Sequence, residues 1–421
     1  MRLNFIGDDG NPLILPWTFP QDPSLGTITA GSLDRTILAN GTLVIDTHGP
    51  DNQAVQVGSA QLLTNGTVGG FAVSKYNFTG QESALPLETR DAPSYVMAFD
   101  NTNSVALGVA LDNVSTSSAS VQMVLRDDAG NQIGGDSLNL VGSGHTSFVL
   151  APTYPVTANR RGTIEFIRPT GGKISALAVR FTPPGTLTTI PVLANVTNTG
   201  GTVPHITSGG GWKTTVVLIN TGTAPTQAHL NFFDDAGNPL TLPLTFVQTG
   251  TNSSASQVDR TIAGKASLII ESTGPSSIPV QIGSMQLITT DGSVGGYVIF
   301  RYEPNGQESN APFENRGANA YVIPFDHTAG IVTGTAVNNA SAQAVDVPII
   351  FRDDAGIQTG TGTIHIPANG HTAFGLATRF PITTNIRGTV EFDTPAGAQI
   401  NVLGVRTPAT LTFTTLPPIT R

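Results

Sequence analysis

The stretch VVLINTGTAPTQAHLNFFDDAG (residues 216–237) decides the fold, because the chain repeats it. It aligns without a gap with TAVNNASAQAVDVPIIFRDDAG (335–356), and it also matches GVALDNVSTSSASVQMVLRDDAG (108–130). Each copy combines an apolar strand pattern, a turn led by Asn, a strand of alternating residues and a pair of aspartates. Such recurrence predicts a modular β protein.

Longer stretches show two copies of one unit. RGTIEFIRPTGGKISALAVR (161–180) returns as RGTVEFDTPAGAQINVLGVR (387–406), and GTVGGFAVSKYNFTGQES (66–83) returns as GSVGGYVIFRYEPNGQES (292–309), both at an offset of 226 residues. The aligned aspartates divide each unit again, at Asp8, Asp128, Asp235 and Asp354. We therefore predict four homologous modules, named modules 1 to 4 below, at residues 1–89, 90–194, 195–315 and 316–421.

The modules have the length and strand pattern of immunoglobulin-like β-sandwiches. Short β-branched and aromatic runs such as KTTVVLIN and INVLGVR are bounded by Gly, Asn and Pro, and we expect very little helix. The predicted fold class is all-β, with tandem immunoglobulin-like β-sandwich domains in two 226-residue repeats. The Pro- and Thr-rich segment TPPGTLTTIPVLANVTNTGG (182–201) is predicted to be a semi-rigid linker.

Module 1 begins halfway through its own template. Met1 aligns with Ala228, so module 1 has no counterpart to VPHITSGGGWKTTVVLINTG (203–222), which we expect to form two strands. A sandwich without two strands exposes core and unpaired edges. Two expectations stay open: the chain is a piece of a longer array, or a neighbouring subunit donates the strands. The C-terminal tail TLTFTTLPPITR (410–421) is the segment to follow for donation.

The composition argues against several classes of function. Only 12% of the residues are charged and the net charge is −9, so we expect no nucleic-acid partner. No apolar run is long enough to span a membrane. Cysteine is absent, which removes disulfides and thiolate–metal sites. Residues 1–16 lack a signal-peptide pattern, so export would depend on a signal outside this sequence.

The adjacent aspartates suit either a turn or a calcium site. Asp followed by Gly favours a hairpin turn, because Asp accepts backbone N–H groups and Gly adopts positive φ. A calcium site needs more oxygen ligands than two neighbouring side chains, which point to opposite faces of an extended chain. Gly7 also replaces the first aspartate in module 1. We therefore predict a turn.

The repeated histidines do not form a catalytic pattern. His145 and His371 are equivalent, but each lies between Gly and Thr, which indicates an ordinary polar loop residue. There is no Gly-x-Ser-x-Gly motif and no cysteine nucleophile.

The recurring glutamates favour structural ion pairs over chemistry. Glu82 and Glu308 recur in GQES, while Glu88 and Glu314 each precede an arginine by two residues at a module junction. We assign no catalytic, cofactor-binding or metal-binding residue, and we expect no cofactor.

Several phrases resemble repeat units of large secreted or surface proteins of environmental, acidobacteria-like bacteria. They are HITSGGGWKTTVVLINTG, NFFDDAGNPLTLPLTF, YVIPFDHTAG and RGTVEFDTPAGAQINVLGVR, and the resemblance covers nearly the whole chain. That group consists of uncharacterised tandem-repeat β-sandwich proteins. The resemblance implies arrays of sandwiches at an extracellular or cell-surface location, and it implies no catalytic residues.

We therefore predict a structural extracellular protein that is not an enzyme. It would be a subunit of a surface fibre, filament or matrix that assembles head to tail, with strand donation as one route. The expected partners are copies of itself or further repeats of the same protein, without nucleic acid or a membrane span. The alternative is an adhesin stalk or a carbohydrate-binding accessory region of a larger secreted protein. Trp17 and Trp212 align with apolar positions, which weakens that alternative.

Overall fold

Antiparallel β-strands make up most of the protein. The computed structural model describes residues 1–47, 49, 54–183, 185–194, 200–274, 276–410 and 412–421. Helix is limited, among these residues, to α1 (Leu150–Thr153), α2 (Leu376–Arg379) and three 3-10 turns at Pro23–Leu25, Pro155–Thr157 and Pro381–Thr383. The predicted all-β sandwich class is confirmed.

Modules 2 and 4 share one sheet arrangement. In module 2 the sheets β12-β11-β14-β9-β17 and β13-β10-β15-β16 face each other, and module 4 has β31-β30-β33-β28-β36 and β32-β29-β34-β35. The strands of module 2 are β9 (Ser94–Asp100), β10 (Ala106–Asn113), β11 (Ala119–Asp127), β12 (Gln132–Leu140), β13 (His145–Val149), β14 (Arg161–Ile167), β15 (Ile174–Thr182), β16 (Thr186–Ile190) and β17 (Leu193–Ala194). Those of module 4 are β28 (Ala320–Asp326), β29 (Val332–Asn339), β30 (Val345–Asp353), β31 (Gln358–Ile366), β32 (His371–Gly375), β33 (Arg387–Asp393), β34 (Ile400–Thr407), β35 (Thr414–Leu416) and β36 (Ile419–Thr420).

Module 3 adds an outer hairpin to the same plan. Its sheets are β18-β25-β20-β23 and β22-β21-β24-β19-β26-β27. Burial alternates along β20, whose sequence TQAHLNFF places Ala228, Leu230 and Phe232 in the core, as a strand with one buried face requires. The strands are β18 (Gly201–Ser208), β19 (Trp212–Asn220), β20 (Thr226–Phe233), β21 (Leu242–Phe246), β22 (Thr251–Ala255), β23 (Gln257–Ile262), β24 (Ser267–Ser272), β25 (Gln281–Thr289), β26 (Val294–Tyr302) and β27 (Gln307–Pro312).

Module 1 has the counterparts of these strands except β18 and β19. Its described strands form the sheets β4-β1-β6 and β3-β2-β5 and the hairpin β7-β8. Its small core consists of Phe5, Trp17, Phe19 and Leu33, with Trp17 stacked on Phe5 at 3.8 Å between ring centroids. The strands are β1 (Arg2–Gly7), β2 (Leu15–Thr18), β3 (Ile28–Ala30), β4 (Ser32–Asp34), β5 (Asp46–Thr47), β6 (Gly58–Leu63), β7 (Phe71–Tyr76) and β8 (Gln81–Pro86).

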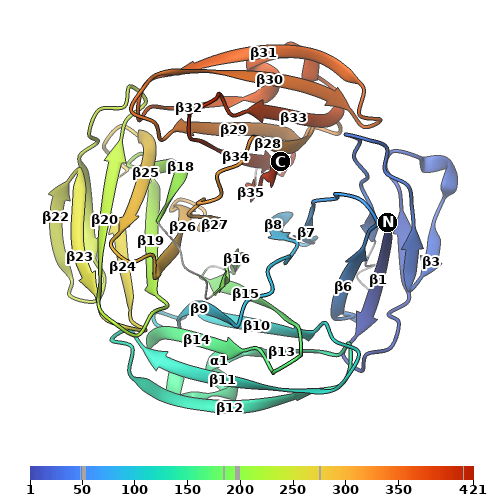
Figure 1. The fold of residues 1–421 in the computed structure, drawn as a ribbon, viewed down its shortest axis with the longest axis horizontal. Helices are drawn as coiled ribbons and strands as arrows, with labels where there is room; N and C mark the ends of the chain where they lie inside the picture. Colours follow the sequence, from blue (N-terminus) through green and yellow to red (C-terminus); the bar gives the residue numbers. More distant parts are fainter. Residues whose placement is uncertain (48, 50–53, 184, 195–199, 275, 411) are drawn as a thin grey trace.

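The modules follow one another around a central axis, so that module 4 returns to module 1 (Figure 1). The strands β8, β16, β27 and β35, one from each module, lie at the centre of this ring. The predicted linker 182–201 is wrong where the structure describes it, because it contains β16 and β17. The preference of the β-branched residues in TLTTI for a strand outweighs the tendency of the Pro- and Thr-rich composition to form a linker.

The C-terminal tail belongs to module 4. Within it, β35 pairs with β34 and β36 pairs with β28, just as β16 and β17 pair with β15 and β9 in module 2. The tail therefore does not complete module 1 of its own chain.

Candidate functional site

The first aspartate of the repeated motif closes its own turn. Asp127 Oδ1 accepts the Asn131 N–H at 2.9 Å, Asp234 Oδ1 accepts the Asn238 N–H at 2.8 Å, and Asp353 Oδ1 accepts the Ile357 N–H at 2.9 Å. The predicted turn is confirmed.

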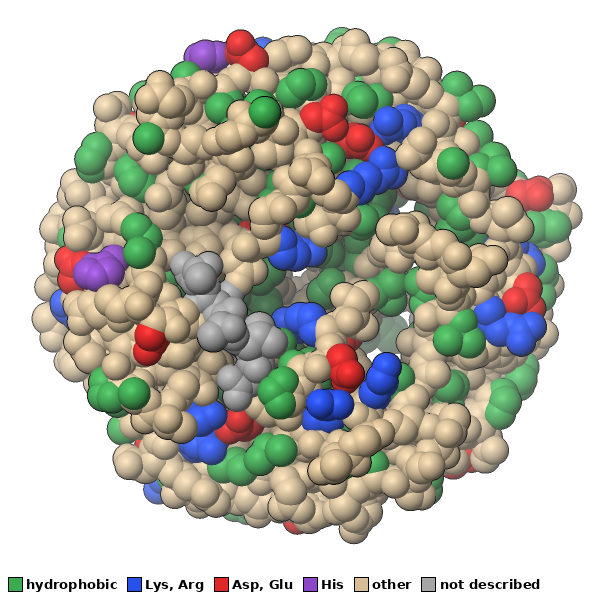
Figure 2. Space-filling view, viewed as in Figure 1, with side chains coloured by type: hydrophobic (Ala, Val, Ile, Leu, Met, Phe, Trp, Pro, Cys, Tyr) green, Lys and Arg blue, Asp and Glu red, His purple; other side chains and the backbone are tan. Residues whose placement is uncertain are grey.

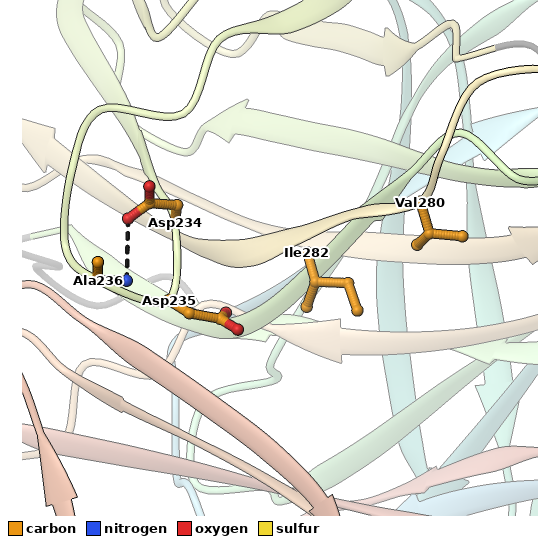
Figure 3. Close-up of a pocket in the computed structure, with 5 residues that line it drawn as sticks. All are labelled: Asp234, Asp235, Ala236, Val280 and Ile282. Atoms are coloured by element: carbon orange, nitrogen blue, oxygen red, sulfur yellow. Dashed lines mark hydrogen bonds between the residues drawn. The ribbon is translucent and has the colours of Figure 1, made fainter.

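The second aspartate points out of the turn. Figure 3 shows the Asp234 carboxylate bent back onto the Ala236 nitrogen, whereas the Asp235 carboxylate projects away from it. The shallow depression beside this turn is also lined by Val280 and Ile282, which are exposed. Because the two carboxylates diverge, they do not face a common point.

The second aspartate binds the next module in all four copies, a contact we call the latch. The partner donates its backbone N–H to the aspartate carbonyl and bonds the aspartate Oδ1 through its own side chain. The side-chain distances are 2.8 Å for Asp8–His145, 3.0 Å for Asp128–Ser267, 2.8 Å for Asp235–His371 and 2.7 Å for Asp354–Thr42. The fourth latch joins module 4 to module 1 and closes the ring.

The glycine of each turn permits this close approach. Gly356 has φ +83, and a Cβ on it would lie 2.2 Å from the carbonyl oxygen of Ala39 in module 1. Gly237 has φ +83, and its Cβ would lie 1.9 Å from the carbonyl oxygen of Ala368 in module 4. Glycine is therefore required here both by the backbone conformation and by the neighbouring module.

The prediction that His145 and His371 are ordinary loop residues is wrong. Each begins a strand, β13 or β32, and each is buried against the latch aspartate of the preceding module. Sequence reasoning missed them because a latch joins residues more than 130 positions apart. The available signal was that aspartate and histidine recur together at nearly the same repeat offset.

One latch extends into a chain of three side chains. His205 of β18 lies with Nδ1 3.1 Å from Nε2 of His371, whose Nδ1 contacts Asp235. When His371 donates to the aspartate from Nδ1, its Nε2 accepts the Nδ1–H of His205. Burial is the main cause that lowers the pKa of His205 to about 3; the electrostatic interaction with His371 acts in the same direction, and Asp235 opposes the shift.

The central strands are joined by ion pairs between modules. Glu308 of β27 has its side chain 2% exposed and binds Arg180 of module 2 at 3.1 Å and Arg301 at 2.9 Å. Glu82 of β8 binds Arg406 of module 4 at 2.8 Å. The recurring Glu of GQES thus meets the recurring Arg that ends LAVR or LGVR.

Hydroxyl groups surround these ion pairs. Ser83 and Thr189 lie 3.0 Å apart between β8 and β16, and Ser309 and Thr415 lie 2.9 Å apart between β27 and β35. Lys and Arg side chains also gather around the centre of the face in Figure 2. The axis of the ring is therefore a buried polar seam.

The remaining residues that the sequence singled out form ion pairs or pack against neighbouring side chains. Arg90 binds Glu88 at 2.6 Å and also donates to the Val192 carbonyl, and Arg316 binds Glu314, as the predicted junction ion pairs require. Trp212 is partly buried against Tyr302.

No family model matches the chain, and none of the curated proteins matches it. Within the described residues, no group of three or more His, Cys, Asp or Glu side chains is placed to hold a metal ion. The same part of the chain contains no helix with the length and hydropathy of a membrane span. The recurring residues thus meet in two kinds of place, the latches and the central seam.

Substituting the latch glycine tests ring closure. We expect Gly356→Ala to lower the free energy of unfolding by roughly 1–3 kcal/mol more than Gly397→Ala, because overpacking adds to the strain of positive φ. Gly397 is the matched control, with φ +76 and no atom within 4 Å of its Cβ position. Calorimetry measures stability, and small-angle scattering should show a larger radius of gyration for Gly356→Ala alone. Equal effects of the two substitutions would contradict the latch at this junction.

Neutralising Glu308 tests the central seam. We expect Glu308→Gln to destabilise the protein by on the order of 3 kcal/mol, because two guanidinium groups lose a buried partner. Glu303→Gln is the control, since this carboxylate is 47% exposed and binds the same Arg301; it should cost less than about 1 kcal/mol. Urea unfolding gives both values, and a Glu308→Gln protein as stable as the control would refute the assignment.

The lowered pKa of His205 predicts a dependence of stability on pH. Between pH 6.5 and about 3 the unfolded chain binds a proton that the folded His205 does not, so stability falls on acidification through this window. We expect the His205→Gln variant to lose stability less steeply, by up to about 1.4 kcal/mol per pH unit. His365→Gln, at an exposed histidine, should follow the wild type. Denaturant unfolding at several pH values measures the slopes, and parallel slopes for wild type and His205→Gln would disprove the effect.

Proposed function

We propose that the chain is a structural subunit of an extracellular assembly and that it is not an enzyme. The observation that carries the proposal is the use of the recurring residues. The latch aspartates and their partners, Glu82 and Glu308, and Arg180 and Arg406 all bind neighbouring modules. A repeat protein whose recurring polar residues hold its modules together is suited to a structural role in an assembly.

Head-to-tail assembly remains part of the proposal, but the closed ring changes its route. The latch that would join module 4 of one copy to module 1 of the next is occupied within the chain. Intramolecular contact benefits from a high effective concentration, so isolated chains favour the closed ring. Copies would therefore associate through another surface, and the strand edges of module 1 supply one.

The resemblance of the repeated phrases to secreted repeat proteins motivates the extracellular part of the proposal. The resemblance to secreted repeat proteins points to an extracellular or cell-surface site. The alternative, an adhesin stalk or carbohydrate-binding region, would use an exposed aromatic platform. Tyr76 and Phe78 are exposed, 5.4 Å apart between ring centroids, but their planes are tilted by 51°. That geometry favours the structural role over a flat sugar platform.

Electron microscopy and light scattering over a range of concentrations test this function. We expect 43.6 kDa rings at low concentration and larger ordered particles, with the ring as repeating unit, at high concentration. Val73→Lys on β7 should prevent association, whereas Ile288→Lys, at an exposed position on β25 of module 3, should not. Single rings at every concentration would contradict the assembly role. Binding of such rings to glycan arrays would favour the alternative.

A further inference from the structure

We infer that module 1 carries a strand-acceptor site between β5 and β7, and that its occupant is a β-hairpin with the sequence pattern of β18 and β19. The inference deepens the proposed function, on which it rests for its role in assembly.

Comparison of the sheets locates the site. In module 3, β19 lies between β24 and β26 in the order β22-β21-β24-β19-β26-β27. In module 1 the counterparts are β3-β2-β5 and, as a separate sheet, β7-β8. In the second sheet, β4-β1-β6, the strand β6 is at the edge. Its counterpart in module 3, β25, pairs with β18. The described part of module 1 thus has open ladder edges on β5, β7 and β6.

Equivalent residues on the strands that flank the open position differ in burial between modules 1 and 3. Ile299 on β26 is 5% exposed, but its counterpart Val73 on β7 is 38% exposed. Ile269 on β24 is 7% exposed, and its counterpart Val44 is 36% exposed. Figure 2 shows the surface hollowed between module 1 and the central strands. In module 3, Ile299 and Ile269 lie with Val217 and Ile219 of β19 on the sheet face that packs against module 2. Val73 and Val44 therefore mark the corresponding apolar face of module 1, on the two strands that flank the open position.

The aromatic residues identify one feature of the occupant. In module 3, Trp212 of β19 packs on Tyr302 with ring centroids 4.9 Å apart. Tyr76, the counterpart of Tyr302, is 47% exposed. A large aromatic at the Trp212 position of the hairpin would cover Tyr76, which explains the exposed ring better than a sugar platform does.

The same hairpin would also bind both neighbours of module 1. In module 3, Val217 and Ile219 of β19 pack against the core of module 2, while β18 contacts β29 and β34 of module 4. By the cyclic order of the ring, a hairpin in module 1 would contact modules 4 and 2. It would also place a histidine beside His145, where His205 lies beside His371.

The occupant must be a hairpin that is not already folded. The tail of this chain is paired within module 4, and β18 and β19 supply core residues such as Val203 and Leu218 to module 3. Releasing either would open another module. A further copy of the repeat's first hairpin therefore fits the site, with main-chain bonds to both edges as in strand addition.

A peptide with the sequence GTVPHITSGGGWKTTVVLIN (201–220) tests the site on the full chain. We expect saturable one-to-one binding, a blue shift of the peptide's tryptophan fluorescence, and exchange of β7 amides slowed by at least about tenfold. A scrambled peptide should not bind. Val73→Lys should abolish binding and Ile288→Lys should retain it. Absence of binding with a well-dissolved peptide would count against the site.

A fused hairpin removes doubt about peptide solubility. Residues 201–227 placed before Met1 continue the repeat register, because Met1 aligns with Ala228. We expect this chain to unfold at higher temperature and to protect its β7 amides from exchange. Unchanged β7 exchange in the fused chain would overturn the inference. Because the fused hairpin fills the edges through which copies would associate, we expect the fused chain to stay a single ring. An unfused chain that binds the peptide but never assembles at any concentration would leave the site standing and refute the assembly role.

Discussion

The closed ring depends on the contact between Asp354 and Thr42. The other three junctions are also covalent connections along the chain, but module 4 meets module 1 through non-covalent contacts. There the Thr42 N–H and hydroxyl bind Asp354, Arg387 donates to the Pro20 carbonyl, and Arg406 binds Glu82. Each is modest alone. Together they close the ring because the chain already holds the two modules near each other.

The latch has one geometry and two chemical forms. Modules 2 and 4 present histidine to the aspartate, and modules 3 and 1 present Ser267 and Thr42. A hydroxyl and an imidazole Nδ1 both reach the carboxylate, but only the imidazole has a second nitrogen for a further partner. Burial also raises the pKa of Asp128, and the Ser267 hydroxyl opposes that shift. The junctions are therefore alike in shape but differ in the chemistry of the partner side chain.

Local features of this structure could be predicted from the sequence, and features that join modules could not. The turn at Asp234 follows from Asp, Gly and their spacing, because its hydrogen bonds stay within four residues. The role of Asp235 depends on a residue 136 positions away, for which one sequence carries no direct signal. The sequence predicts a linker where β16 lies, because composition does not reveal that its Thr hydroxyls are buried at the ring axis and bind other modules instead of water.

The latches also explain how module 1 keeps its place with so small a core. Its own buried cluster is Phe5, Trp17, Phe19 and Leu33, far fewer residues than the cores of modules 2 to 4. Asp8 fixes it to module 2, and Thr42 and Glu82 fix it to module 4, so neighbours on both sides add to its internal packing. In a repeat protein, the energy of interfaces adds to that of each module. Module 1 therefore gains stability from two interfaces in the ring, whereas a module at the end of a linear array would have one.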